Sequence, residues 1–201
     1  RDLADLYDLK FDDILDYLEE LGDRLDINKN EHMQRSRDLT YDATPLPREI
    51  IDMGYNGFGS FFERNKMRQI AEKSVGLDYL EGWVEHKLID GVIIKIRAFG
   101  SRTLHIVAGN GPGLGLITLA RCALTRCDCI IKAPSNDPFT SAALALTMCD
   151  MAPDHPITRH FSVAYWKGGD AEVEDKLYKP HNIEKIIAWG GLAGIRHVTK
   201  Y

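Results

Sequence analysis

Residues 104–201 repeat one pattern four times: a short apolar stretch, a turn that is usually rich in glycine, and a helix. Short apolar strands that alternate with helices predict a parallel sheet covered by helices on both faces. In such sheets ligands bind beyond the carboxyl ends of the strands, so the turns are the first place to look for a site. The expected strands are Leu104–Val107, Cys129–Lys132, Phe161–Trp166 and Ile183–Trp189, and the expected helices are Leu114–Arg126, Pro138–Cys149, Asp170–Tyr178 and one beginning near Leu192.

Residues 1–90 differ from this pattern and are expected to form a helical, acidic segment, and residues 91–201 are expected to form a second unit that contains the four repeats. Apolar residues from Phe11 to Leu21 recur every three or four positions, which predicts an amphipathic helix that stops at Gly22. Residues 26–47 are polar and weakly periodic, so we expect a connecting or wrapping segment there. Further helices are expected over 61–75 and 80–88, and a strand over 92–99.

Composition narrows the class of protein. The 201 residues are 44% hydrophobic and 27% charged, which is typical of a globular chain. Residues 1–60 carry 15 acidic against 7 basic side chains, and the mildly basic remainder does not indicate a nucleic-acid partner. No apolar run is long enough for a membrane span and no signal peptide is evident, so we expect a cytoplasmic protein. The chain begins at Arg1 and stops within an expected helix, as a piece of a longer protein would.

The four cysteines lie in apolar surroundings without the paired spacing of a metal site: Cys122, Cys127, Cys129 and Cys149. This usage favours reduced thiols in the core. The seven histidines also show no ligand spacing, so the sequence predicts no metal.

The first turn, residues 109–115, has the sequence GNGPGLG. It matches the dinucleotide fingerprint loosely, because its last three glycines step by two and no acid follows at the distance expected of a ribose ligand. A tight loop that only reverses the chain is the alternative. Asn110 can offer an amide donor to a developing oxyanion, or can simply be a turn residue with a left-handed backbone.

The second turn places Lys132 at the end of a buried strand, where its ammonium must reach either solvent or an anion. Ser135 offers a hydroxyl to the same ligand. The run from Asn136 to Pro138 also predicts an ordinary helix start, with Asp137 as the N-cap and Pro138 as the first helical residue. The third and fourth turns contain glycine pairs that can expose backbone N–H groups to phosphate or can serve the turn alone. These pairs are Gly168-Gly169 and Gly190-Gly191.

The order and spacing of four segments resemble the cofactor domain of the LuxC-type acyl-CoA reductases, a branch of the aldehyde dehydrogenase superfamily. The segments are HIVAGNGPGLGLITLARCAL, CIIKAPSNDPFTSAALALTM, YWKGGDAEVE and KIIAWGGLAGIRHV. The resemblance covers residues 90–201 in detail, and it implies that residues 91–201 are the NAD(P)-binding domain, which would end before the catalytic cysteine domain. It implies a Rossmann-like parallel sheet with a helical N-terminal segment, and an NADPH-dependent reductase that converts a fatty acyl thioester to the aldehyde through a cysteine acyl-enzyme.

The resemblance also assigns roles to residues. Asn110 would donate to the oxyanion, as the only catalytic residue in this chain. The cofactor would lie against Val107 and Ala108 on its nicotinamide side, against Lys132, Pro134 and Ser135 at the adenosine ribose, and against Gly168, Gly169, Trp189, Gly190 and Gly191 at the adenine and pyrophosphate. Ser135 stands where the superfamily commonly has a glutamate, so less repulsion meets a 2′-phosphate and NADPH is favoured over NADH.

None of the four cysteines matches the family nucleophile, which the resemblance places beyond Tyr201; this chain alone would then bind cofactor without catalysing. The acyl donor would be acyl-CoA or an acyl carrier protein thioester, and homo-oligomers or an acyl-transfer partner are typical of such enzymes. The acidic N-terminal helix could be a partner surface or a solvated face. A CoA-acylating short-chain aldehyde dehydrogenase would share these turns, and a non-catalytic nucleotide-binding scaffold would keep the fold without the nucleophile.

Overall fold

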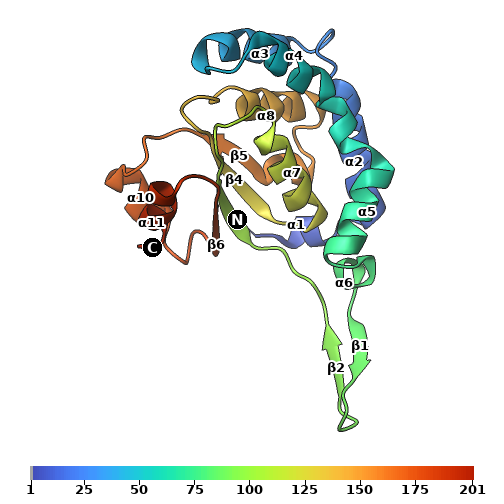
Figure 1. Cartoon of the computed structure of the whole chain (residues 1–201). Coiled ribbons are helices and arrows are strands. Elements are labelled where there is room, and N and C mark those ends of the chain that lie inside the picture. The colour runs from blue at the N-terminus through green and yellow to red at the C-terminus, as the bar shows by residue number, and fades with distance from the viewer. Residues whose placement is uncertain (1) are drawn as a thin grey trace.

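A computed structural model describes residues 2–201 and contains a four-stranded parallel sheet at its centre (Figure 1). The strand order is β5-β4-β3-β6, and every neighbouring pair is parallel. This confirms the parallel sheet expected from the sequence. The strands are β3 (Arg102–Ile106), β4 (Asp128–Lys132), β5 (Phe161–Ala164) and β6 (Lys185–Ala188).

Helices cover both faces of the sheet, as its apolar strands require. On one face, buried Cys129 and Ile131 of β4 belong to a large core that includes the helices after β3 and β4. On the other face, Leu104 of β3 packs in a smaller core with Trp166 and Tyr178. The helices of this half are α7 (Leu114–Leu124), α8 (Thr140–Met151), α9 (Pro156–Arg159), α10 (Ala171–Leu177) and α11 (Leu192–Val198).

The N-terminal part is helical, as expected, and packs as an outer layer on α7 and α8 (Figure 1). One continuous core runs from Leu6 in this layer to Phe161 in β5. The division of the chain at residue 90 stays a prediction, and the core crosses it. The elements are α1 (Ala4–Tyr7), α2 (Phe11–Arg24), α3 (Glu31–Ala43), α4 (Arg48–Gly57), a short 3-10 helix η1 (Gly59–Phe62), α5 (Arg64–Ser74) and α6 (Leu77–Glu81).

The expected connector over residues 26–47 was wrong, because α3 occupies most of it. The buried positions of α3 are Met33, Ser36 and Thr40. Because two of these three side chains are polar, the sequence of α3 lacks the apolar periodicity that marks the inner face of a helix. Both hydroxyls lie within hydrogen-bond distance of the buried Tyr55 hydroxyl, 2.7 Å from Ser36 and 3.1 Å from Thr40. Burial of polar groups is tolerated here because they bond to one another.

Two further expectations were wrong. Gly22 does not stop α2, which continues to Arg24; a Cβ at Gly22 would lie 2.8 Å from the carbonyl oxygen of Gly59, so glycine allows α2 and η1 to approach closely. The expected helix over 80–88 ends at Glu81, and β1 (Val84–Lys87) follows it. β1 pairs antiparallel with β2 (Ile93–Ile96), within the strand expected over 92–99, and Lys95 of β2 forms an ion pair with Glu85 at 3.0 Å.

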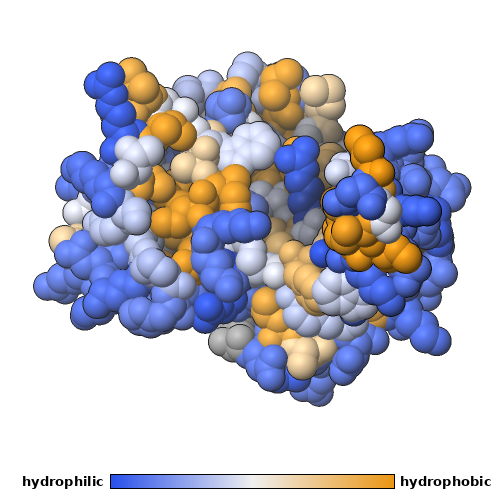
Figure 2. Space-filling model, turned by 90° about the horizontal axis from the view of Figure 1, so that it is seen from below, coloured by the Kyte–Doolittle hydropathy of each residue, from blue (hydrophilic) through white to orange (hydrophobic). Residues whose placement is uncertain are grey.

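The β1–β2 hairpin projects away from the rest of the molecule (Figure 1). Large hydrophobic side chains are exposed on it, including Ile89 at its tip and Ile93 at 63%. Figure 2 views the molecule from the side on which the hairpin projects and shows several hydrophobic patches on this face. A two-stranded hairpin is marginal by itself, and exposed apolar patches mark contacts with other proteins. No helix among residues 2–201 is long and apolar enough to cross a membrane.

We expect the hairpin to mediate self-association. Ile93→Lys should shift the protein to a smaller species in sedimentation velocity, because a charge at this exposed apolar position disfavours burial against a second copy. Met53→Lys on α4, a hydrophobic position that is equally exposed but lies away from the hairpin, is the matched control. An Ile93→Lys protein that sediments like the parent would contradict the expectation.

Candidate functional site

A cleft of about 750 Å³ opens beyond the carboxyl ends of β3 and β6. The chain runs from β3 outward to β4 and β5 and then returns to the other side of β3 to form β6, so the turns after β3 and β6 lead in different directions. Ligands in open α/β sheets bind at this reversal of strand order. The cleft is lined by Ala108, Gly109, Asn110, Leu114, Asn136, Ala188, Trp189, Gly190 and Gly191.

Asn136 shapes the cleft, whereas the sequence predicted only a helix start at this point. That prediction was wrong by two residues, because α8 begins at Thr140 with Phe139 as its N-cap. Its side-chain Nδ2 donates to the Gly109 carbonyl at 2.5 Å, which ties the turn after β4 to the turn after β3. A Cβ at Gly109 would lie 1.5 Å from Asn136 Oδ1, so only glycine lets the two turns meet. The sequence contains a hint of this bond, because a side-chain amide in one turn can donate to a glycine carbonyl in another. The partner could not be identified from the sequence, because it is 27 residues away.

Asn110 is exposed at the cleft, and its side chain makes no hydrogen bond to another residue of the described chain. The alternative prediction, that Asn110 is a turn residue with a left-handed backbone, was wrong. Within residues 2–201, Arg126 is the only non-glycine residue with positive φ. The left-handed residue of this turn is Gly113, with φ +97°, and α7 begins directly after it. The amide of Asn110 is therefore free to meet a ligand, with α7 starting four residues later.

Lys132 ends β4 beside the cleft without lining it. Burial lowers the pKa of Lys132, and nearby Glu174 opposes that shift. Its ammonium lies 5.3 Å from the centre of the Trp166 ring and forms no ion pair among the described residues. Ser135 is exposed and Pro134 half-buried, next in the same turn. A partly desolvated cation without an ion-pair partner can accept an anion.

Two of the predicted cofactor-binding segments do not line the cleft. Val107 is buried in the core, 6% exposed, and does not line the cleft. Gly168 and Gly169 are exposed away from the cleft, and the Gly169 N–H donates to Glu174 at 3.1 Å, so that N–H is not open to phosphate. By contrast, Trp189, Gly190 and Gly191 line the cleft, and their contacts with adenine and pyrophosphate stay a prediction.

Glu174 is a second residue that the sequence gave no role. It is 1% exposed and accepts from Trp166 Nε1 at 3.2 Å as well as from Gly169, and it pairs with His197 of α11. Burial raises its pKa, but the bonds from His197, Gly169 and Trp166 outweigh this, and the net pKa is lowered. The carboxylate therefore fixes the turn after β5 and joins it to the helix after β6.

None of the four cysteines lines the cleft. Cys122 and Cys129 are buried, Cys127 is half-buried and Cys149 is exposed on α8. Hydrogen bonds from Cys129 and His105 lower the pKa of Cys122, while burial raises that of Cys129. A nucleophile for chemistry in this cleft is thus not supplied by the described residues.

Solved structures share this fold at low sequence identity. Gamma-glutamyl phosphate reductase from Thermotoga maritima matches with a TM-score of 0.61 and 13% identity over 98% of this chain and 48% of its own. An E. coli NADP-dependent enzyme matches with a TM-score of 0.68 and 16% identity over 98% and 39%. The chain therefore has the α/β fold found in these two enzymes.

The family is shown by sequence. The model of the acyl-CoA reductase (LuxC) family matches residues 6–200, and the chain belongs to that family. It is 34% identical over 202 residues to a long-chain acyl-protein thioester reductase of Photorhabdus laumondii, and 31% identical over 204 residues to one of Vibrio harveyi. The alignments cover 96% and 98% of this chain, which spans about 40% of the length of either relative.

Replacing Asn136 tests the tie between the two turns. Asn136→Asp should lower stability by about 1–2 kcal/mol, because a carboxylate cannot donate to the Gly109 carbonyl and repels it. Urea unfolding followed by circular dichroism measures this. Asn65→Asp, at an exposed position in the first turn of α5, is the control, and equal midpoints for the two variants would show that the tie contributes nothing.

Asp137 makes folding depend on pH. Burial raises its pKa from 3.8 to about 6, although bonds from Thr140 oppose the shift. The folded state therefore binds a proton at higher pH than the unfolded chain does. The cost of its charge, about 3 kcal/mol, is present above pH 6 and is relieved as pH falls toward 4.

Asp137→Asn keeps the Oδ1 acceptor for Thr140 and removes the charge. We expect it to raise the free energy of unfolding at pH 7.5 more than at pH 5, as measured by urea titration at both values. Asp154→Asn, at an exposed carboxylate, should show no such difference. An Asp137→Asn gain that is equal at both pH values would contradict the assignment.

Proposed function

We propose that this chain is the cofactor-binding part of an NADPH-dependent reductase that converts a fatty acyl thioester to the aldehyde through a cysteine acyl-enzyme. The observation that carries the proposal is the cleft at the strand reversal, where Asn110 stands exposed and unengaged among glycines. Membership of the acyl-CoA reductase family and relatives named long-chain acyl-protein thioester reductases support the reaction class.

The residues present fit a dinucleotide. Gly109 is a position where a side chain would fill the space between the two turns, and Gly190 and Gly191 leave backbone open at the opposite wall. Lys132, with Ser135 beside it, would meet the 2′-phosphate, since its ammonium is desolvated and unpaired within the described chain. Bound NADPH would supply the hydride.

The chain's own contribution to the chemistry is electrostatic. Attack of a thiolate on a thioester carbonyl places negative charge on its oxygen, and the Asn110 amide would donate a hydrogen bond to that oxygen. The thiol of the donor, CoA or an acyl carrier protein, then leaves and the acyl group stays on the attacking cysteine. That cysteine is not one of Cys122, Cys127, Cys129 or Cys149, because none of them lines the cleft.

Cofactor titration tests this proposal. Following reduced-nicotinamide fluorescence, we expect saturable binding of NADPH that is tighter than binding of NADH. Lys132→Ala should weaken NADPH binding by roughly tenfold, the loss of about 1.4 kcal/mol, and leave NADH binding nearly unchanged, because only NADPH carries the 2′-phosphate. Lys73→Ala, an exposed lysine of α5, is the matched control.

Equal affinity for both cofactors, unchanged by Lys132→Ala, would overturn the assignment of this turn. Absence of binding of either cofactor would overturn the proposal that this chain binds cofactor by itself, and titration of the full-length protein would then separate a site that needs the second domain from a non-catalytic scaffold with the same fold. A CoA-acylating dehydrogenase that prefers NADH would reverse the order of the two affinities. The order of the two affinities therefore distinguishes the NADPH-dependent reductase from the CoA-acylating dehydrogenase.

A further inference from the structure

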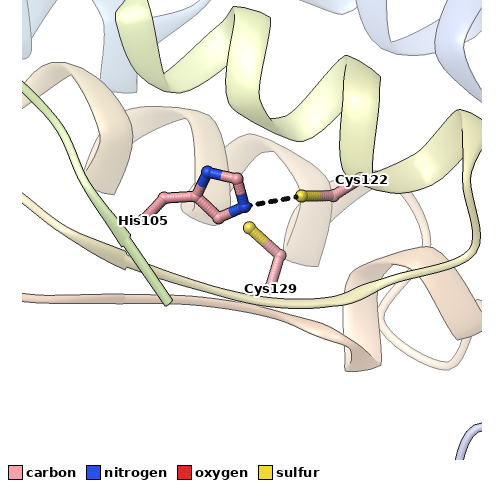
Figure 3. A group of neighbouring side chains, drawn as sticks. All are labelled: His105, Cys122 and Cys129. Atoms are coloured by element: carbon pink, nitrogen blue, oxygen red, sulfur yellow. Dashed lines mark hydrogen bonds between the residues drawn. The ribbon is translucent and has the colours of Figure 1, made fainter. Parts of the chain in front are cut away.

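Three buried side chains that can bind metal converge between the sheet and α7. His105 comes from β3, Cys122 from α7 and Cys129 from β4, and their side chains point toward one another (Figure 3). Their ligand atoms all lie within 4.8 Å of one another. The Cys122 Sγ lies 3.3 Å from His105 Nε2. No spacing motif marks the group in the sequence, because the three residues belong to three different elements.

The distances suit a tetrahedral ion. Zinc binds sulfur at about 2.3 Å and imidazole nitrogen at about 2.1 Å, which places neighbouring ligand atoms roughly 3.5–3.8 Å apart. The Cys122–His105 pair is already near that value, and a side-chain adjustment of about 1 Å brings in the third ligand. All three residues are fixed by the sheet or by a helix, so the ion would meet a largely preformed site.

The donor set selects the metal. Two thiolates and one imidazole favour zinc over hard cations such as magnesium and calcium, which prefer oxygen. Two thiolates also balance the charge of a divalent ion, so the occupied site would be neutral, as its burial requires. The two thiol protons leave to solvent when the ion binds, and no oxidation or reduction is needed.

We propose that His105, Cys122 and Cys129 form a zinc-binding site. The fourth position faces an apolar cavity of about 510 Å³ whose lining includes His105, Cys122 and Thr103. The Thr103 hydroxyl lies 3.2 Å from His105 Nε2 and 3.9 Å from Cys122 Sγ, so a polar oxygen stands beside that position. The cavity also provides the route by which the ion enters.

The position of the site gives it a structural role. His105 lies two residues before Val107, at the end of β3, and Cys122 lies near the end of α7, so the ion joins the strand and the helix on the two sides of the glycine turn. Cys129 adds the neighbouring strand. An ion bound only by the folded chain stabilises it by mass action, and here it would hold the turn that carries Asn110.

The test measures zinc content and stability together. After reduction and dialysis against zinc, we expect one equivalent of zinc per chain by plasma mass spectrometry and a rise in melting temperature that EDTA reverses. Cys122→Ala and Cys129→Ala should lose the zinc and the rise. Cys127→Ala, a neighbouring thiol of the same cavity, and Cys149→Ala, an exposed thiol, should keep both.

A second measurement on the unaltered protein keeps the proposal testable if a variant fails to fold. X-ray absorption of the zinc-loaded protein should show two sulfur neighbours and at least one imidazole. Zinc that binds only through oxygen and nitrogen, zinc retained by both alanine variants when circular dichroism shows them folded, or no retained zinc would each overturn the site. So would a Cys122–Cys129 disulfide that forms equally with and without zinc present, because it would show that the pair is a redox couple instead.

Discussion

The hydrogen bonding of β3 on both of its edges is the constraint on which the rest of the molecule depends. β3 pairs with β4 on one side and with β6 on the other, both in parallel. A parallel strand must be reached by a crossover, so the chain places α7 and α8 over one face and α10 over the other. Because the strand order reverses at β3, the turn after β3 and the turn after β6 lead in different directions. The cleft is the space between these two turns.

Hydrogen bonds from side chains then fix the turns, which lie outside the hydrogen-bonded strands. Asn136 joins the turns after β3 and β4, and Glu174 joins the turn after β5 to α11 through Gly169 and His197. Both side chains bond to the backbone of a glycine, Gly109 or Gly169, where the backbone has the most freedom to lose. The cleft is therefore bordered by turns whose shape is fixed before any ligand arrives, which lowers the cost of ordering them on binding.

The outer helical layer was harder to predict than the sheet. Apolar periodicity located α2, whose buried face is a row of leucine and isoleucine, but not α3, whose buried face carries Ser36 and Thr40 bonded to Tyr55. The hairpin was predicted only in part for a similar reason: the sequence predicted the strand that contains β2 but not β1. Its strands are short and mostly exposed, so their alternation does not report a buried face. Polarity patterns locate a face only where that face is apolar.

The sequence by itself determined the parallel α/β fold, the family, and several residues of the cleft, among them Asn110, Trp189 and Gly190. These follow from local pattern and motif order, which each segment carries within itself. Only the tertiary structure decided that Asn136 reaches Gly109, that Val107 turns into the core, that Glu174 takes the Gly169 N–H, and that His105 meets Cys122 and Cys129. These contacts join segments that are distant in the chain or depend on which way a side chain turns, and strand pairing and helix packing alone fix both.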